Sequence, residues 1–169
     1  TASYATCRYL KEHYKDKKLF ALGTPSFVEE LRSFGLAVTE QSEKDADCVV
    51  VGFDRTLSYE KVETACELLF RPAVDFIGTN PDLKCPTAFG FVPDCGGICA
   101  MLTAAVARTP LYIGKPSAEI VTLCTKQVNA KPEEVLVVGD RLYTDIACGI
   151  NAGVETALVY TGEAKEKDL

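Results

Sequence analysis

Short runs of β-branched residues, each followed by a segment with helical periodicity, limit the fold of this sequence more than any other feature. Residues 47–53 (DCVVVGF) and 134–139 (EVLVVG) are apolar without alternation, which is typical of strands buried on both faces of a parallel sheet. In residues 58–69 the apolar side chains recur at helical spacing and share one face. Strands that alternate with helices in this way predict an α/β fold with a parallel sheet.

The first part of the chain repeats this alternation up to about residue 110. Thr24 followed by Pro25 indicates a helix start, because threonine caps a first turn and proline suits the first helical position. Gly35 is placed to end that helix. Residues 80–97 contain three prolines and three glycines, and we expect a long loop there with room for a hairpin. The expected helices are residues 4–14, 24–34, 58–69 and 98–107, and the expected strands are 18–23, 36–39, 47–53 and 75–79.

The alternation restarts in the second part of the chain. Strands are expected at residues 111–114, 134–139 and 155–160, with helices at 116–128 and 144–152. The break in composition at 80–97 and the restart after it indicate two domains, with residues 1–110 in the first and residues 111–169 in the second.

The charge balance narrows the choice of partners. The net charge is −6, from 18 basic and 24 acidic residues, which disfavours broad nucleic-acid binding because that needs a basic face. No run reaches the roughly 18 apolar residues of a membrane-spanning helix. The first residues show no basic stretch followed by an apolar run, so they do not resemble a signal peptide. We therefore expect a cytoplasmic protein that binds neither nucleic acid nor membranes.

Cysteine and histidine usage excludes several kinds of site. Four of the eight cysteines lie within apolar stretches, where a free cysteine behaves as a small hydrophobe, so we expect no disulfide framework. Cys95 and Cys99 have ligand-like spacing, but no second pair or histidine lies nearby, which argues against zinc. The only histidine, His13, lies in a polar run before several lysines. The sequence therefore argues against triads that need a catalytic histidine.

Two aspartates follow the expected strand at residues 134–139. Asp140 comes directly after the strand, and Asp145 falls in the first turn of the next helix. Ligands of open α/β sheets bind at the carboxyl ends of the strands, and Mg²⁺ prefers carboxylate oxygens. Taken singly, each residue is also typical of a turn or of a helix start. As a pair after such a strand, Asp140 and Asp145 predict a Mg²⁺ site.

The second strand-to-helix junction carries a lysine. In Gly114-Lys115-Pro116-Ser117 a strand ends, the lysine follows, and a helix is expected to begin at once. There Lys115 and the helix N-terminus would both attract phosphate oxygens. A surface lysine before a helix is common, so Lys115 alone is a weak signal.

Together these motifs resemble a known family. The segment GKPS, a helix, and then EVLVVGDRLYTDIACGINAG closely resemble motifs three and four of the haloacid dehalogenase-like hydrolases, in particular their p-nitrophenyl phosphatase branch. VVVGFDRTLSYEKV and FIGTNPDLKCPT resemble segments of the large α/β cap of that branch. The resemblance implies that residues 1–110 form the cap domain, and that residues 111–169 form the C-terminal half of a doubly wound, Rossmann-like catalytic core.

The resemblance also implies roles for individual residues. Lys115 would neutralise the phosphate of a small phosphorylated metabolite. Asp140 would coordinate Mg²⁺, and Asp145 would bind it through water or orient its shell. The cap loop that selects the substrate would contain Asn80, Pro81, Asp82, Leu83, Lys84 and Cys85, and Asp54 and Arg55 would lie on a second cap loop.

The aspartate nucleophile of the family does not appear in this sequence. It belongs to a D-x-D-G-T motif, from which an aspartyl-phosphate forms. The nearest string, Phe53-Asp54-Arg55-Thr56-Leu57, has no second aspartate two residues from Asp54, and arginine replaces the glycine. We interpret it as a decoy within a cap segment. The nucleophile motif and the family's phosphate-binding Ser/Thr motif are expected before Thr1, and the last core strand is expected after Leu169, so the chain alone is expected to be inactive.

Other readings remain open at this point. One alternative is a binding or interaction module that derives from such a phosphatase but no longer does chemistry. A receiver-like domain, with Asp54 phosphorylated, ranks lower because GKPS and the 80–97 loop do not fit it. Caps of this branch often pair, so a homodimer through the cap is a further hypothesis.

Overall fold

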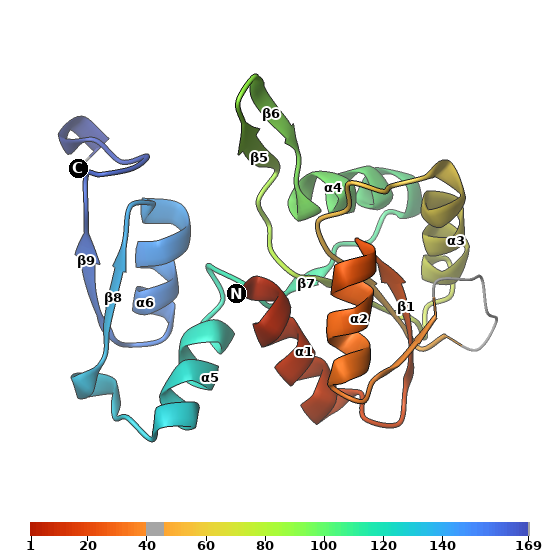
Figure 1. Cartoon of the computed structure of the whole chain (residues 1–169), viewed down its shortest axis with the longest axis horizontal. Coiled ribbons are helices and arrows are strands. Elements are labelled where there is room, and N and C mark those ends of the chain that lie inside the picture. Colours follow the sequence, from red (N-terminus) through yellow and green to blue (C-terminus); the bar gives the residue numbers. More distant parts are fainter. Residues whose placement is uncertain (40–45, 169) are drawn as a thin grey trace. The chain divides into compact units, whose positions relative to one another are not determined.

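A computed structural model describes residues 1–39 and 46–168 of the chain (Figure 1). It contains two units, Thr1–Ile113 and Gly114–Leu169, which are treated separately below. Within the described ranges, no helix is both long enough and apolar enough to pass through a bilayer. The elements of the first unit are α1 (Ala2–His13), β1 (Lys18–Leu22), α2 (Pro25–Ser33), β2 (Ala37–Thr39), β3 (Cys48–Val51), α3 (Tyr59–Leu69), β4 (Asp75–Gly78), β5 (Lys84–Thr87), β6 (Gly90–Pro93), α4 (Cys95–Val106) and β7 (Leu111–Tyr112).

A five-stranded parallel sheet forms the centre of the first unit. Its strand order is β2-β1-β3-β4-β7, and each neighbouring pair is parallel. All four residues of β3 are buried, as the run of valines predicts. The chain leaves β1 toward β2 on one side and later returns to β3 on the other. The carboxyl ends of β1 and β3 therefore flank a switch point, where open α/β sheets bind ligands.

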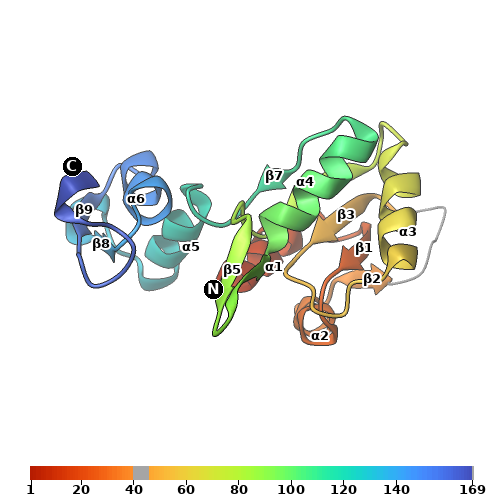
Figure 2. The ribbon, with the colours of Figure 1, turned by 90° about the horizontal axis from the view of Figure 1, so that it is seen from above.

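Helices cover both faces of this sheet, with α3 and α4 on one face and α1 and α2 on the other (Figure 2). The main core lies under α3 and α4. Alternate strand residues, including Phe20, Val49 and Phe76, pack there against Leu68 and Leu102. Because alternate residues of a strand point to opposite faces, the remaining strand residues are buried under α1 and α2.

Local signals in the sequence set both ends of α2 and the start of α3. The predicted cap at Thr24 is confirmed, since its Oγ1 accepts a hydrogen bond from the Phe27 N–H at 3.3 Å. Gly35 follows α2 with a φ of +79°, a conformation that costs little without a Cβ. Ser58 caps α3 in the same way as Thr24 caps α2.

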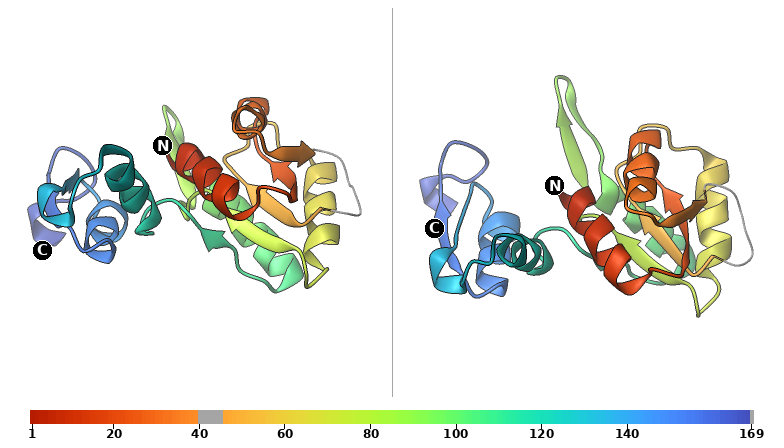
Figure 3. Two further views of the ribbon diagram at one scale, coloured as in Figure 1. Left: turned by 90° about the horizontal axis from the view of Figure 1, so that it is seen from below. Right: turned by 60° about the horizontal axis from the view of Figure 1, so that its bottom comes forward.

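The 80–97 segment contains the hairpin for which the prediction left room. Strands β5 and β6 pair antiparallel, and the hairpin extends away from the five-stranded sheet (Figure 3). The predicted start of the next helix at Ile98 is wrong, because α4 begins at Cys95 and Asp94 caps it. Gly96 allows this early start: its N–H donates to the Asp82 carbonyl at 2.9 Å, and a side chain there would collide with the Pro81 and Asp82 backbone.

The strand at Leu111–Tyr112 belongs to the first unit and does not open the second. It pairs with β4, so that Ile77 lies beside Leu111 and Gly78 beside Tyr112. The division between the units consequently follows Ile113, a little later than the expected boundary at residue 110. An apolar run identifies a strand, but it does not say which sheet the strand will join.

The second unit is a smaller α/β layer built on the parallel pair β8 (Leu136–Gly139) and β9 (Glu155–Leu158). The predicted helix start at Pro116 is wrong, because residues 115–118 form turns before α5 (Glu119–Val128) begins. The prediction that β8 is buried on both faces is also wrong, since Leu136 and Val138 are 55% and 58% exposed. The elements are α5 (Glu119–Val128), η1 (Pro132–Glu134), β8 (Leu136–Gly139), η2 (Leu142–Ile146), α6 (Ala147–Asn151), β9 (Glu155–Leu158) and η3 (Glu166–Asp168).

The half-buried Arg108 holds the C-terminal end of α3. Its guanidinium donates to the carbonyls of Leu69 at 2.7 Å, Arg71 at 3.1 Å and Val74 at 2.7 Å. Hydrogen bonds from a charged donor contribute about 1.5–3 kcal/mol each to stability. When the guanidinium is removed, water can hydrogen-bond to the three freed carbonyls, which offsets part of the loss. Arg108→Ala should therefore lower the free energy of unfolding by about 2–3 kcal/mol in urea titrations followed by circular dichroism. The exposed Arg8→Ala is the control, and equal midpoints for the two variants would contradict this role.

Candidate active site

The carboxyl ends of β8 and β9 lie at one edge of the second unit, and Asp140 lies at that edge. It follows Gly139, the last residue of β8. One carboxylate oxygen, Oδ2, accepts a hydrogen bond from the Glu163 N–H at 2.7 Å, and the Asp140 carbonyl accepts one from Ala164 N–H at 3.0 Å. The segment after β9 thus fixes both the backbone and one oxygen of Asp140.

Asp145 lies in η2, a single turn of π-helix, and is 8% exposed. Its Oδ1 forms an ion pair with the Lys115 ammonium, and its Oδ2 accepts a hydrogen bond from the Arg141 N–H at 3.2 Å. A Cβ built on Gly139 would overlap the Asp145 side chain. Glycine at the end of β8 therefore leaves the space that the Asp145 carboxyl fills.

Two opposing effects act on the pKa of Asp145. Burial raises it, but the hydrogen bond and the positive charge of Lys115, together with backbone N–H groups of Arg141 and Asp140, lower it by more. The pKa therefore lies below the usual value for an aspartate, and Asp145 is a carboxylate near neutral pH.

Lys115 is placed differently from the sequence expectation. It lies in the turn closed by the Ser117 N–H and the Gly114 carbonyl at 3.0 Å, ahead of the first residue of α5. Its ammonium pairs with Asp145. Sequence reasoning missed this pair, because no local pattern links two residues thirty positions apart.

The second unit provides carboxylates suited to Mg²⁺, although no group of three or more histidine, cysteine, aspartate or glutamate side chains converges within residues 1–39 and 46–168. Mg²⁺ usually takes one or two protein carboxylates and completes its shell with water and phosphate oxygens. Among the described residues, no hydrogen bond occupies Oδ1 of Asp140. Asp140 therefore fits a direct ligand, whereas both oxygens of Asp145 are engaged, which fits an outer position.

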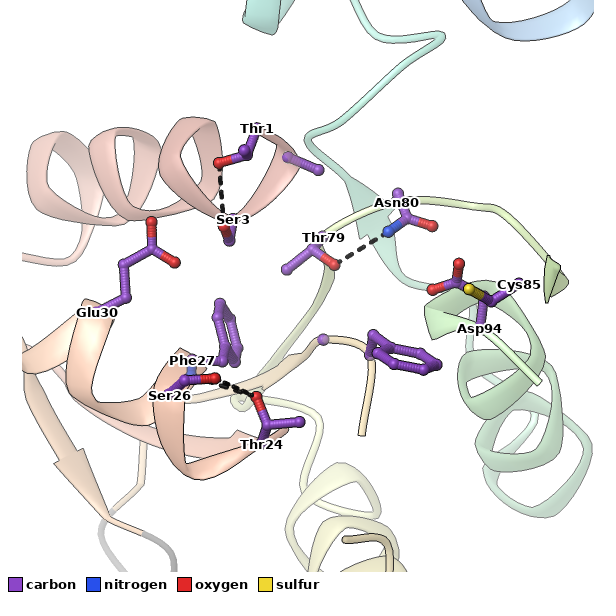
Figure 4. A pocket seen from close by; sticks show the side chains of 13 residues that line it. Thr1, Ser3, Thr24, Ser26, Phe27, Glu30, Thr79, Asn80, Cys85 and Asp94 are labelled. Atoms are coloured by element: carbon purple, nitrogen blue, oxygen red, sulfur yellow. Dashed lines mark hydrogen bonds between the residues drawn. The ribbon is translucent and has the colours of Figure 1, made fainter. Parts of the chain in front are cut away.

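A separate cavity of about 410 Å³ lies in the first unit. It is located at the carboxyl ends of β1, β3 and β4, where Thr24, Gly52 and Thr79 line it (Figure 4). This is the switch point of the sheet, the place where such folds bind ligands. Strand-end positions could have revealed these three residues from the sequence, whereas the contribution of Glu30 from α2 could not be foreseen.

Comparison with known proteins identifies the family. A model described as HAD-hydrolase-like matches residues 112–169. The chain is 36% identical over its whole length to 5'-nucleotidase YutF of Bacillus subtilis, and 34% identical to ribonucleotide monophosphatase NagD of Escherichia coli, covering 64% of each. A solved 4-nitrophenylphosphatase from Thermotoga maritima superposes with a TM-score of 0.92 at 37% identity, covering 100% of this chain and 64% of that one.

The chain belongs to the haloacid dehalogenase-like hydrolases. Within them it falls in the p-nitrophenyl phosphatase branch, as the motifs predict. A p-nitrophenyl phosphatase from Archaeoglobus fulgidus also superposes, with a TM-score of 0.91 at 33% identity, over 99% of this chain and 64% of that one. The chain therefore spans a little under two thirds of the length of these relatives.

The loop that was expected to select the substrate lies only partly at the cavity. Asn80 and Cys85 line the cavity, whereas Asp82 and Lys84 do not. The Asn80 side chain is held at both ends, since its Oδ1 accepts from the Asp82 N–H at 3.0 Å and its Nδ2 donates to Thr79 Oγ1 at 3.4 Å. The Lys84 ammonium lies 4.4 Å from the centre of the Phe91 ring.

Asp54, the nucleophile-like residue, is enclosed in the first unit. Its side chain is 0% exposed. Oδ1 accepts hydrogen bonds from the Thr56 N–H and Oγ1, both at 2.7 Å, and Oδ2 pairs with the Lys61 ammonium at 2.9 Å. A carboxylate with both oxygens engaged and no exposed surface is poorly placed to attack phosphorus, which favours the decoy interpretation.

Proposed function

We propose that this chain is the cap and the second half of the catalytic core of a Mg²⁺-dependent phosphomonoesterase of small phosphorylated metabolites. The observation that carries the proposal is the cluster at the carboxyl edge of β8, where Lys115 pairs with Asp145 and Asp140 keeps one oxygen open. A cation and two carboxylates at such an edge suit a phosphate and its metal.

Each residue of the cluster has a distinct proposed role. Asp140 holds Mg²⁺ through its open oxygen, and Asp145 orients Lys115 while staying ionised. The Lys115 ammonium neutralises charge on the phosphoryl oxygens as attack proceeds. Mg²⁺, when bound, supplies further positive charge to the same oxygens. The attacking carboxylate comes from outside these 169 residues, since D-x-D-G-T does not occur in them.

The first unit provides the substrate pocket in this proposal. The cavity at its sheet edge combines aromatic, hydroxyl and amide side chains, as in Phe27, Ser26 and Asn80. Such a mixture is typical of small-molecule sites, which are concave with a few oriented polar groups.

The test is a phosphatase assay on the whole protein with p-nitrophenyl phosphate and a panel of sugar and nucleoside monophosphates, with and without Mg²⁺. We expect Mg²⁺-dependent turnover, and Asp140→Asn should lower kcat/KM by about a hundredfold or more, in line with the loss of one group that stabilises transition-state charge. A Mg²⁺-induced thermal shift that Asp140→Asn abolishes would support the ligand role independently of turnover. Full activity of Asp140→Asn would contradict it, and no turnover with any ester would favour a non-catalytic binding module.

A further inference from the structure

The segment that follows β9 lies against Asp140 in the second unit. Strands β8 and β9 are parallel, so both end at the same edge of their sheet (Figure 1). A Cβ built on Gly162 would overlap the carboxyl group of Asp140. Glycine at this position therefore lets the backbone of the segment reach the side chain that the proposed function assigns to Mg²⁺.

Two backbone N–H groups of this segment bind Asp140. The Glu163 N–H donates to Oδ2 at 2.7 Å, and the Ala164 N–H donates to the carbonyl at 3.0 Å. Ala164 is itself buried, which anchors the segment at this point. Because the first bond engages Oδ2, the position of the segment decides which oxygen of Asp140 stays open.

The side chain of Glu163 fastens the segment to the loop that begins with Asp140. Its Oε1 accepts a hydrogen bond from the Tyr143 hydroxyl at 2.8 Å, and its Oε2 pairs with Nε of Arg141 at 2.8 Å. An exposed ion pair alone contributes little to stability. Here, however, the backbone and both carboxylate oxygens of one residue contact the same four-residue stretch, and together they hold the Glu163 N–H against Asp140.

We propose that Glu163 is a positioning residue for the Mg²⁺ site. Its side chain holds the segment after β9 in place, so that the Glu163 N–H fixes Oδ2 of Asp140 and leaves Oδ1 to the metal. The proposal rests on the proposed function for the identity of the cation. Losing a group that orients a metal ligand typically costs about tenfold to a hundredfold in metal affinity or activity, so an effect of Glu163 through Asp140 is measurable.

Calorimetric titration of the whole protein with Mg²⁺ tests this role. Glu163→Ala removes both side-chain contacts and should raise the Kd for Mg²⁺ by about tenfold. Glu163→Gln removes the same charge but keeps an oxygen that can accept from Tyr143, so its Kd should rise less. A purely electrostatic effect would make the two variants equal. Glu166 is exposed in the same C-terminal segment, and Glu166→Gln is the matched control that should leave the Kd unchanged.

Two further variants separate the contact from the charge. Removing a positive charge near a cation site would by itself tighten Mg²⁺ binding, yet we expect Arg141→Met to weaken it, because the ion pair with Glu163 is lost. Gly162→Ala leaves every charge in place and should also weaken binding, because its Cβ displaces the Asp140 carboxyl. Urea midpoints followed by circular dichroism check that each variant is folded.

Hydrogen exchange adds a measurement that does not involve the metal. In the metal-free whole protein, the amide hydrogens at positions 163 and 164 should exchange faster in Glu163→Ala than in the native chain, because their hydrogen bonds to Asp140 open more often. Exchange within β8 should stay the same, which distinguishes this local opening from a general loss of stability.

The outcomes distinguish this inference from the proposed function. Equal Kd values for the native protein, Glu163→Ala and Gly162→Ala would overturn the positioning role and leave the phosphatase function standing. Equal Kd values for Glu163→Ala and Glu163→Gln, or tighter binding by Arg141→Met, would also overturn it, since Glu163 would then act only through its charge. The expected losses of Mg²⁺ affinity in a protein that hydrolyses no phosphate ester would uphold the positioning role and count against the phosphatase function.

Discussion

Replacing Lys115 with methionine should lower kcat/KM of the whole protein for p-nitrophenyl phosphate by about two to three orders of magnitude. Removing one preorganised group that stabilises transition-state charge typically costs a hundredfold to a thousandfold. Lys115 has a second task, since its ammonium pairs with Asp145 beside Gly139. Methionine keeps most of the side-chain length but removes the charge. The loss in kcat/KM therefore measures the contribution of the ammonium group.

Two further variants sharpen this result. Lys115→Arg keeps the charge but changes its geometry, and should retain more activity than methionine, though less than the native lysine. Lys126 is an exposed lysine on α5, and Lys126→Met should leave kcat/KM within a factor of about two, as surface substitutions usually do. A loss of less than about tenfold in Lys115→Met, with the fold intact by circular dichroism, would remove Lys115 from the proposed site.

Asp54→Asn should destabilise the first unit by about 3 kcal/mol without removing activity per folded molecule. Breaking a buried ion pair by removing one partner costs roughly 3–5 kcal/mol. The low end applies here, because the Lys61 side chain is 19% exposed and can turn toward water. In the native chain, Asp54 Oδ1 accepts a hydrogen bond from the Thr56 N–H at 2.7 Å. The side-chain oxygen of asparagine can accept the same bond.

A double-mutant cycle isolates the pair. Lys61→Met alone leaves the Asp54 carboxylate buried and uncompensated, so the double variant should be more stable than the sum of the two single losses predicts. The exposed Asp16→Asn serves as the control and should shift the urea midpoint little. If Asp54→Asn abolished turnover while leaving the urea midpoint unchanged, Asp54 would be the nucleophile and the decoy interpretation would be wrong.

Local patterns in the sequence predict the elements of this fold well. The valines of β3, the Thr24 cap and Gly35 each act within a few residues of where they stand, and the structure confirms all three. The family assignment also follows from contiguous motifs around GKPS and GDRLYTDI. The start of α5 escaped prediction, because Pro116 suits a first helical turn as well as the turn that precedes the helix.

The sequence alone therefore determined the alternation of strands and helices, the p-nitrophenyl phosphatase branch, and the position of Asp140 at the end of a strand. Tertiary structure decided that β7 joins the first sheet, that Lys115 pairs with Asp145, and that Glu30 and Asp94 line one cavity. The physical reason is range: capping and periodicity act over a few residues, whereas pairing between distant strands and side chains depends on how the whole unit packs.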